Sequence, residues 1–302
     1  MSVIENTLKR LQGQQRAVPP AAPPPAFAAV VSTGAAARRQ ASNSGDEVPK
    51  PERAIVIDQA ALRAAGMLPP AHQEHELSQE YRRIKRPLIN SALGRGVAAL
   101  PRGNLIMITS AVPGEGKTFM SLNLAFSICL EEDVTVLLVD GDVVNPRISQ
   151  ILGVETEPGL LDLIKDPSLP FASLVLPTDV PGLSFLPAGR QDANATELLA
   201  SARMQAVMSQ LGSADPSRLV LFDSAPLLVT TESQALAHSA GQVLAVVRAD
   251  QTPQHVLLDA LDTLDEGKPV SLVLNQSLRP NSGYYYQYGV SARPREQAST
   301  SQ

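Results

Sequence analysis

The sequence of 302 residues contains no tryptophan, a single cysteine (Cys129), and only 4% aromatic residues. One cysteine excludes an internal disulfide, and its place in an apolar helical run favours a buried, reduced thiol, as in cytosolic proteins. No run reaches the roughly 18 apolar residues of a membrane span, and no signal peptide begins the chain. A net charge of -5 argues against coating of nucleic acid. These absences predict a soluble cytoplasmic protein that does not bind nucleic acid.

The composition also divides the chain. Hydrophobic residues make up 44% of it, enough for a globular core, whereas 25 prolines indicate that part of it is not globular. Residues 1–16 form a short amphipathic segment that is either a frayed terminus or a helix that folds against a partner or membrane. Residues 17–53, rich in proline and alanine and then polar, are expected to be a disordered linker.

From about residue 54, apolar strands alternate with helices. Strands are predicted at 104–110, 134–140, 182–189, 218–226, 241–250 and 270–276. Helices are predicted at 194–211, 232–239 and 253–266. Strands that are apolar on both faces are typical of a mostly parallel sheet covered on both sides, an α/β fold whose ligands bind at the carboxyl ends of the strands.

A helical part precedes the first strand, within residues 54–100. Asp58 is expected to cap a helix that Gly66 ends. A second helix is expected over 74–93, interrupted or restarted at Pro87. Its residues Glu80, Arg83 and Arg86 share one face, which is also what a solvated basic helix would show.

The strongest motif is SAVPGEGKT, residues 110–118, between a strand and a helix. It matches the phosphate-loop pattern G-x-x-x-x-G-K-[ST], except that Ala111 replaces the first glycine. Backbone N–H groups at the start of a helix favour anions; Lys117 is placed to reach nucleotide phosphates and Thr118 to ligate Mg²⁺. The alternative is an ordinary glycine-rich turn. The candidate nucleotide-binding residues are Pro113, Gly114, Glu115, Gly116, Lys117, Thr118 and Phe119.

Carboxylates follow two further strands. Asp140 and Asp142, in LLVDGDVVNP, leave a buried strand two residues apart, which is costly unless a cation lies between them. Asp223 follows the apolar run LVLF, as the metal-holding carboxylate of a Walker B motif does. With Lys117 these three form the predicted catalytic set, and with Thr118 the predicted Mg²⁺ site. For Asp142, a helix cap in a solvated turn is the alternative.

Two features near the C-terminus complete the pattern. Asn275 ends the last predicted strand, where its amide either reads adenine or belongs to a turn. Four of the five tyrosines lie in GYYYQYG, within residues 279–302, a segment expected to be a flexible tail. An edge strand would alternate apolar and polar positions, which this stretch does not. The candidate phosphate acceptors are therefore Tyr284, Tyr285, Tyr286 and Tyr288.

Together the motifs resemble the bacterial tyrosine kinases of exopolysaccharide synthesis, most closely the branch associated with exosortase loci. The resemblance runs over residues 54–276 and rests on EYRRIKRPL, TSAVPGEGKT, LLVDGDVVNP, LFDSAPLL and VLN. It implies a P-loop kinase domain at 54–278 that uses ATP and Mg²⁺ to phosphorylate the tyrosine cluster of a neighbouring subunit. It also implies a ring assembled through Glu80, Arg83 and Arg86.

The resemblance further implies a partner and a location. The partner is a separate membrane-spanning polysaccharide co-polymerase or chain-length protein, which would hold a cytoplasmic kinase at the inner membrane. One departure is clear: the family pattern D-x-D-x-R has arginine where this chain has Val144. Arg147, just beyond Pro146, is the candidate replacement.

Two other functions fit parts of the pattern. Partition and division-site ATPases share this sheet and act as positioning switches without protein phosphorylation. They carry an extra lysine early in the loop, where this chain has Val112. A scaffold that binds ATP only to dock a membrane partner is the third reading, and only Val144 supports it. The missing lysine and the tyrosine tail favour the kinase.

Overall fold

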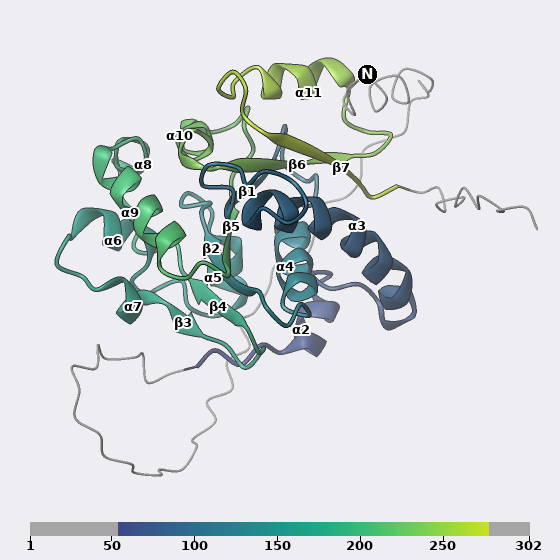
Figure 1. Ribbon diagram of the computed structural model, residues 1–302, viewed down its shortest axis with the longest axis horizontal. Coiled ribbons are helices and arrows are strands. Elements are labelled where there is room, and N and C mark those ends of the chain that lie inside the picture. Colours follow the sequence, from purple (N-terminus) through teal and green to yellow (C-terminus); the bar gives the residue numbers. More distant parts are fainter. Residues whose placement is uncertain (1–53, 278–302) are drawn as a thin grey trace, which may run out of the picture.

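The structure, a computed structural model, describes residues 54–277. The predicted N-terminal segment (1–16), the linker (17–53) and the tail (279–302) with its four tyrosines lie outside the described residues. Within the described range, one sheet of seven strands carries helices on both faces (Figure 1). The predicted α/β fold is confirmed.

The sheet has the strand order β3-β4-β2-β5-β1-β6-β7. Neighbouring strands are parallel except for β3, which pairs antiparallel with β4. The predicted strands are all present; β3 was not predicted, because two residues are too few to show an alternating pattern. The strands are β1 (Leu105–Ser110), β2 (Thr135–Asp140), β3 (Leu176–Pro177), β4 (Leu183–Leu186), β5 (Arg218–Asp223), β6 (Gln242–Arg248) and β7 (Val270–Asn275).

Alternate residues of each central strand feed two separate cores. Leu105 and Met107 of β1 face one core, whereas Ile106 and Ile108 face the other. Each large apolar side chain buried in this way contributes about 1.5–3 kcal/mol. The sheet is therefore fixed between two helical layers, and its register is strongly specified.

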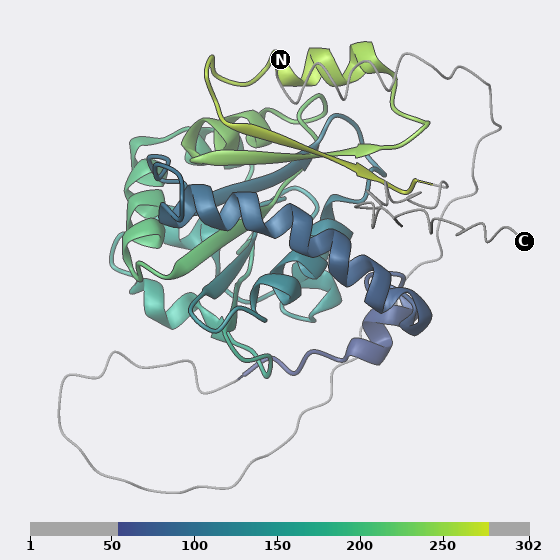
Figure 2. The same ribbon diagram turned by 45° about the vertical axis from the view of Figure 1, so that its right-hand side comes forward.

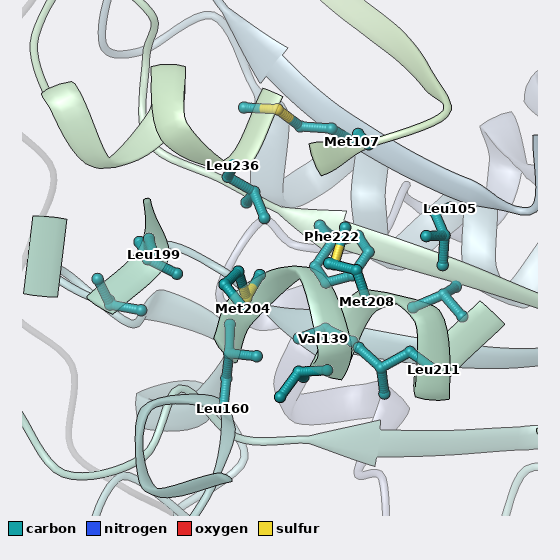
Figure 3. Close-up of a cluster of buried hydrophobic side chains, with 14 of the residues drawn as sticks. Leu105, Met107, Val139, Leu160, Leu199, Met204, Met208, Leu211, Phe222 and Leu236 are labelled. Atoms are coloured by element: carbon teal, nitrogen blue, oxygen red, sulfur yellow. The ribbon is translucent and has the colours of Figure 1, made fainter. Parts of the chain in front are cut away.

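One layer lies against the first core. Figure 3 shows Met204, Met208 and Leu211 of one helix packed on Phe222 and neighbouring side chains of the sheet. The helices that contribute to this core are α6 (Leu160–Lys165), α7 (Phe171–Leu174), α8 (Ala195–Leu199), α9 (Ala202–Ser213), α10 (Thr231–Ser239) and α11 (Gln254–Leu261).

The other layer carries the helical part that precedes β1. Figure 2 shows the long helix α3 lying across this side of the molecule, and α3 packs on α4. Its elements are α2 (Gln59–Ala64), the short 3₁₀ helix η1 (Ala71–Gln73), α3 (Glu74–Leu93), α4 (Lys117–Ile128) and α5 (Arg147–Ile151).

Side-chain caps set the start of three helices, α2, α9 and α10. The Asp58 side chain accepts a hydrogen bond from the backbone N–H of Ala61, so α2 begins as predicted. The predicted single helix over 194–211 is wrong: the Ser201 side chain caps α9, and a break separates it from α8. The predicted interruption at Pro87 is also wrong, because α3 continues through it. Buried Leu88, directly after the proline, anchors the second half of the helix, and this packing outweighs the hydrogen bond that proline cannot donate.

Candidate active site

The phosphate loop runs from the end of β1 to the first residue of α4, Lys117. Gly114 and Gly116 have φ angles of 83° and 93°, in the left-handed region that favours glycine. A Cβ at position 116 would lie 2.1 Å from Nδ2 of Asn275. Glycine is therefore favoured there by its backbone angle, and any larger residue would also displace the Asn275 side chain from the loop. The loop ends where the positive end of the α4 dipole can attract an anion.

A cleft of about 1950 Å³ lies over this loop. Small-molecule sites usually measure about 300–1,000 Å³, so the cleft has room for a nucleotide and part of a second ligand. Seven of the eight residues predicted to bind nucleotide, Asn275 among them, line it; the exception is Glu115, whose side chain is buried.

Asp223 is buried and does not line the cleft, but it accepts hydrogen bonds from two hydroxyl groups of α4. Thr118 donates to its Oδ2 at 2.9 Å, and Ser121 donates to its Oδ1 at 2.8 Å. Thr118 was predicted from the loop motif. Ser121 was not, although it lies one helical turn after Lys117 on the same side of α4.

Asp140 lies next to Asp223, because the register of β2 and β5 places the two residues opposite each other. Its Oδ2 accepts hydrogen bonds from the backbone N–H (2.7 Å) and the hydroxyl (2.8 Å) of Ser149. Its Oδ1 is buried and has no hydrogen-bond partner within residues 54–277. Ser149 was missed, since nothing in its local sequence connects it to a strand end nine residues earlier.

Asp142 is the carboxylate that lines the cleft itself. Its Oδ1 accepts a hydrogen bond of 3.0 Å from the backbone N–H of Asn145, which orders the turn after β2. The turn-forming alternative from the sequence is therefore part of what Asp142 does, and its second oxygen is left for a ligand. Val144 follows on the same turn and is 53% exposed.

Burial and crowding of negative charge raise the pKa values of these carboxyl groups. Burial, reinforced by the charge of Asp223, raises the pKa of Asp140 to about 8. Burial raises the pKa of Asp223 to about 6 and also raises that of Asp142. Burial lowers the pKa of Lys117, against the attraction of Asp223 and Asp142. A cation at this site would relieve the repulsion and let the carboxyl groups ionise.

The oxygen atoms near the phosphate loop fit a Mg²⁺ ion that is held by only a few protein ligands. No three acidic, histidine or cysteine side chains of the described residues converge into a ready-made metal cage. Magnesium in nucleotide sites does not need one, because one or two carboxylates, waters and phosphates usually hold it. The unpartnered Oδ1 of Asp140 and the lone pairs of the Thr118 hydroxyl are suitable oxygen donors.

Glu80, Arg83 and Arg86 lie on α3, where the sequence placed them. Glu80 lines the cleft and pairs with Arg83 at 3.3 Å, while both arginines are exposed. An exposed pair of this kind contributes less than about 1 kcal/mol. The role of the three residues in oligomerisation stays a prediction.

Between residues 54 and 277, no helix has the length and apolar character needed to cross a membrane.

Both the sequence and the fold are similar to those of bacterial tyrosine-protein kinases. No protein-family model matches the chain. It is 30% identical over 211 residues to the tyrosine-protein kinase ptk of Acinetobacter johnsonii, covering 69% of this chain and 28% of ptk. It is 29% identical over 216 residues to the tyrosine-protein kinase YwqD of Bacillus subtilis, covering 70% of this chain and 86% of YwqD.

The solved kinase domain of VpsO superimposes with a TM-score of 0.55 and 25% identity, covering 68% of this chain and 98% of that domain. The chain spans less than a third of the length of several relatives, ptk among them. By sequence and by fold, this chain is a relative of the bacterial tyrosine-protein kinases.

Proposed function

We propose that the chain is an ATP-dependent protein-tyrosine autokinase that phosphorylates the C-terminal tyrosines of a neighbouring subunit. The observation that carries the proposal is the single cleft that joins the start of α4, with Lys117 and Thr118, to Asp142 and, through Thr118, to Asp223. The similarity to tyrosine-protein kinases favours phosphoryl transfer to tyrosine over a positioning ATPase.

The phosphate loop would bind the nucleotide. Backbone N–H groups at the start of α4 face the phosphates, and Lys117 attracts the charge that develops on the transferred group. Thr118, Asp223 and Asp140 would hold Mg²⁺, and Asp142 would hold it only through water, because its free oxygen is needed for proton transfer. When bound, Mg²⁺ neutralises phosphate charge and so eases attack on the γ-phosphorus.

Asp142 is the candidate base. The ordinary tyrosine pKa is about 10, so a phenol at neutral pH must lose its proton during the reaction. Asp142 lines the cleft, and burial raises its pKa, which makes its carboxylate a better proton acceptor. The phenol oxygen bonds to the γ-phosphorus, the bond to the bridging oxygen breaks, ADP leaves, and the proton passes to Asp142.

The tail is suited to this site by position and charge. The last described residues, Asn275 to Ser277, line the cleft, and Tyr284 follows Ser277 by seven positions. Seven extended residues span up to about 24 Å. Four strand spacings separate β7 from β2, about 19 Å. Reach alone therefore permits the chain's own cleft as well as a neighbour's, and the choice of neighbour rests on the family resemblance.

Charge favours docking before phosphorylation and release afterwards. Residues 278–302 contain three arginines and one acidic residue, whereas the cleft is lined by three acidic side chains (Glu76, Glu80 and Asp142) and two basic ones (Lys117 and Arg147). Each phosphate adds about -1.5 to -2 charges, so four would add about -6 to -8. The modified tail would be repelled from Asp142 and its neighbours. Phosphorylation would then limit itself and loosen a ring held by tail docking.

The wider role is part of the same proposal. A ring formed through Glu80, Arg83 and Arg86 and a membrane-spanning co-polymerase as partner would place the kinase at the inner membrane and let it regulate exopolysaccharide synthesis or export. An N-terminal segment beyond a linker is a candidate handle for that partner. Deletion of residues 1–16 should then abolish recruitment, and unchanged recruitment would contradict this part.

The acceptor site is tested by changing all four tail tyrosines to phenylalanine in the full chain. Incubation with Mg-ATP should give no phosphotyrosine signal, while binding of Mg-ADP stays as in the parent. An undiminished signal would exclude the tail.

A mixing experiment decides between own and neighbouring clefts. The four-phenylalanine chain keeps its cleft, and a Lys117→Ala chain keeps its tail. Phosphotyrosine on the Lys117→Ala chain in the mixture supports transfer between subunits. A mixture that gives no phosphotyrosine, while the parent chain by itself does, contradicts it.

A further inference from the structure

Glu115 is an acidic residue inside an anion-binding loop, yet its side chain is only 1% exposed. A carboxylate that faced the phosphates would repel them, strongly so at low dielectric. It does not line the cleft, unlike its neighbours Gly114 and Gly116. The side chain must therefore serve the loop rather than the ligand.

Three donors surround this carboxylate. Its Oε2 accepts a hydrogen bond of 2.9 Å from the backbone N–H of Val112, in the same loop. Its Oε1 accepts one of 3.1 Å from the backbone N–H of Arg248, the last residue of β6, and another from the hydroxyl of Thr252. The first bond closes the loop on itself, and the other two tie it to the connection between β6 and α11.

Two side chains at the end of β7, the strand next to β6, bind the backbone of the loop. Asn275, at the end of β7, donates from Nδ2 to the carbonyl of Glu115 at 2.8 Å, and Gln276 donates to the carbonyl of Gly114 at 3.2 Å. Hydrogen bonds to a carboxylate are about twice as strong as those between neutral groups. The buried bonds of Glu115 therefore form the charged centre of this attachment.

We propose that Glu115 is a positioning residue for the nucleotide, with Thr252 as its partner. Its carboxylate holds the phosphate loop in its anion-binding shape before the nucleotide arrives, so binding does not have to order the loop. The inference rests on the nucleotide site of the proposed function but needs no phosphorylation to be tested.

The test is Glu115→Gln in the full chain, with Mg-ADP as the probe and calorimetry as the readout. Glutamine has the same shape, but in either orientation its amide nitrogen, a donor, faces a backbone N–H, that of Val112 or that of Arg248. The Kd for Mg-ADP should rise about ten-fold or more. In the phosphotransfer assay, KM for ATP should rise by a larger factor than kcat falls.

Thr252 provides an independent check of the pair. Thr252→Val removes one donor and should raise the Kd by a few-fold. In the double variant the valine should add nothing to the effect of Glu115→Gln, because the two changes remove a shared interaction. If Glu115→Gln does not fold, an unchanged Kd in Thr252→Val overturns the proposal by itself.

Asp162 provides the matched control for a merely structural role. Its largely buried carboxylate also accepts two backbone N–H bonds, from Gly159 and Arg190, both at 3.0 Å, away from the cleft. Asp162→Asn should lower thermal stability and leave the Kd for Mg-ADP unchanged. If Glu115→Gln behaves in the same way, the proposal is overturned. A Glu115 effect in a parent that binds Mg-ADP but forms no phosphotyrosine would support this inference while refuting the kinase.

Discussion

Replacement of Asp140 by asparagine should stabilise the nucleotide-free protein, although Asp140 is a candidate catalytic residue. The amide oxygen of asparagine can accept both hydrogen bonds from Ser149, as Oδ2 of Asp140 does. The amide nitrogen would take the place of the unpartnered Oδ1 and could donate to Asp223, which is opposite in the sheet register. The variant therefore removes a buried charge without removing the contacts that hold the side chain.

The size of the effect should depend on pH. The pKa of Asp140 is raised from 3.8 to about 8 in the folded protein, so the folded state binds a proton that the unfolded state has lost. Asp140 therefore progressively destabilises the parent as the pH rises from about 4 to about 8, and the asparagine variant lacks this contribution. Each pH unit in this window is worth at most about 1.4 kcal/mol. Between pH 5 and pH 7 the difference in unfolding free energy should widen by up to about 3 kcal/mol.

Urea denaturation at pH 5, 6, 7 and 8, in EDTA and without nucleotide, measures this difference. The variant should be more stable than the parent, with a gap that widens with pH. Saturating Mg-ADP should narrow this difference in unfolding free energy. Ligand binding stabilises a protein by an amount that grows with the logarithm of its affinity, and the parent keeps the Asp140 carboxylate that the variant lacks. A variant that is less stable at every pH, or a gap that is constant with pH, would refute the reasoning.

Three further predictions concern other parts of the structure. Burial raises the pKa of Cys129 to about 11, so iodoacetamide should modify it slowly at pH 8 in the native protein and quickly in urea; equal rates would contradict this. Buried Lys85 pairs with Glu131 at 2.7 Å, so Lys85→Ala should lower the free energy of unfolding, measured in urea, by about 1–3 kcal/mol. A change near zero would show that the pair does not stabilise the fold. Val229, 56% exposed in the cleft wall, should on change to lysine reduce tail phosphorylation several-fold without weakening Mg-ADP binding, because the added positive charge repels the arginines of the tail. The same change at Val97, which is 52% exposed outside the cleft, should have no effect on either.

The fold could be predicted because each buried strand is visible in the sequence as a short apolar run. The apolar run before Asp140 and that before Asp223 mark buried strands, and parallel strands bring their carboxyl ends to one edge. Lys117 and Thr118 followed from the loop motif in the same way. What the sequence could not provide is the pairing across the sheet: that Asp140 and Asp223 lie opposite each other depends on the strand order, which local pattern does not encode.

The unpredicted site residues are those whose partners are distant in sequence. Thr252 reaches Glu115 across 137 positions, and Ser149 reaches Asp140 across nine through a turn of irregular shape. Glu115 itself was assigned to nucleotide binding because of its place in the loop, whereas its side chain points into the protein. Only the three-dimensional contacts reveal that the Glu115 carboxylate accepts hydrogen bonds from within the protein and so connects the phosphate loop to the end of β6.

The central claim is that one cleft transfers phosphate from ATP to the tyrosine tail. Mass spectrometry of the purified full chain after incubation with Mg-ATP tests it most directly, with Lys117→Ala and Asp142→Ala chains alongside. The account predicts phosphate on one or more of Tyr284, Tyr285, Tyr286 and Tyr288 in the parent and none in either variant. A parent without phosphotyrosine, or variants modified as fully as the parent, would contradict it.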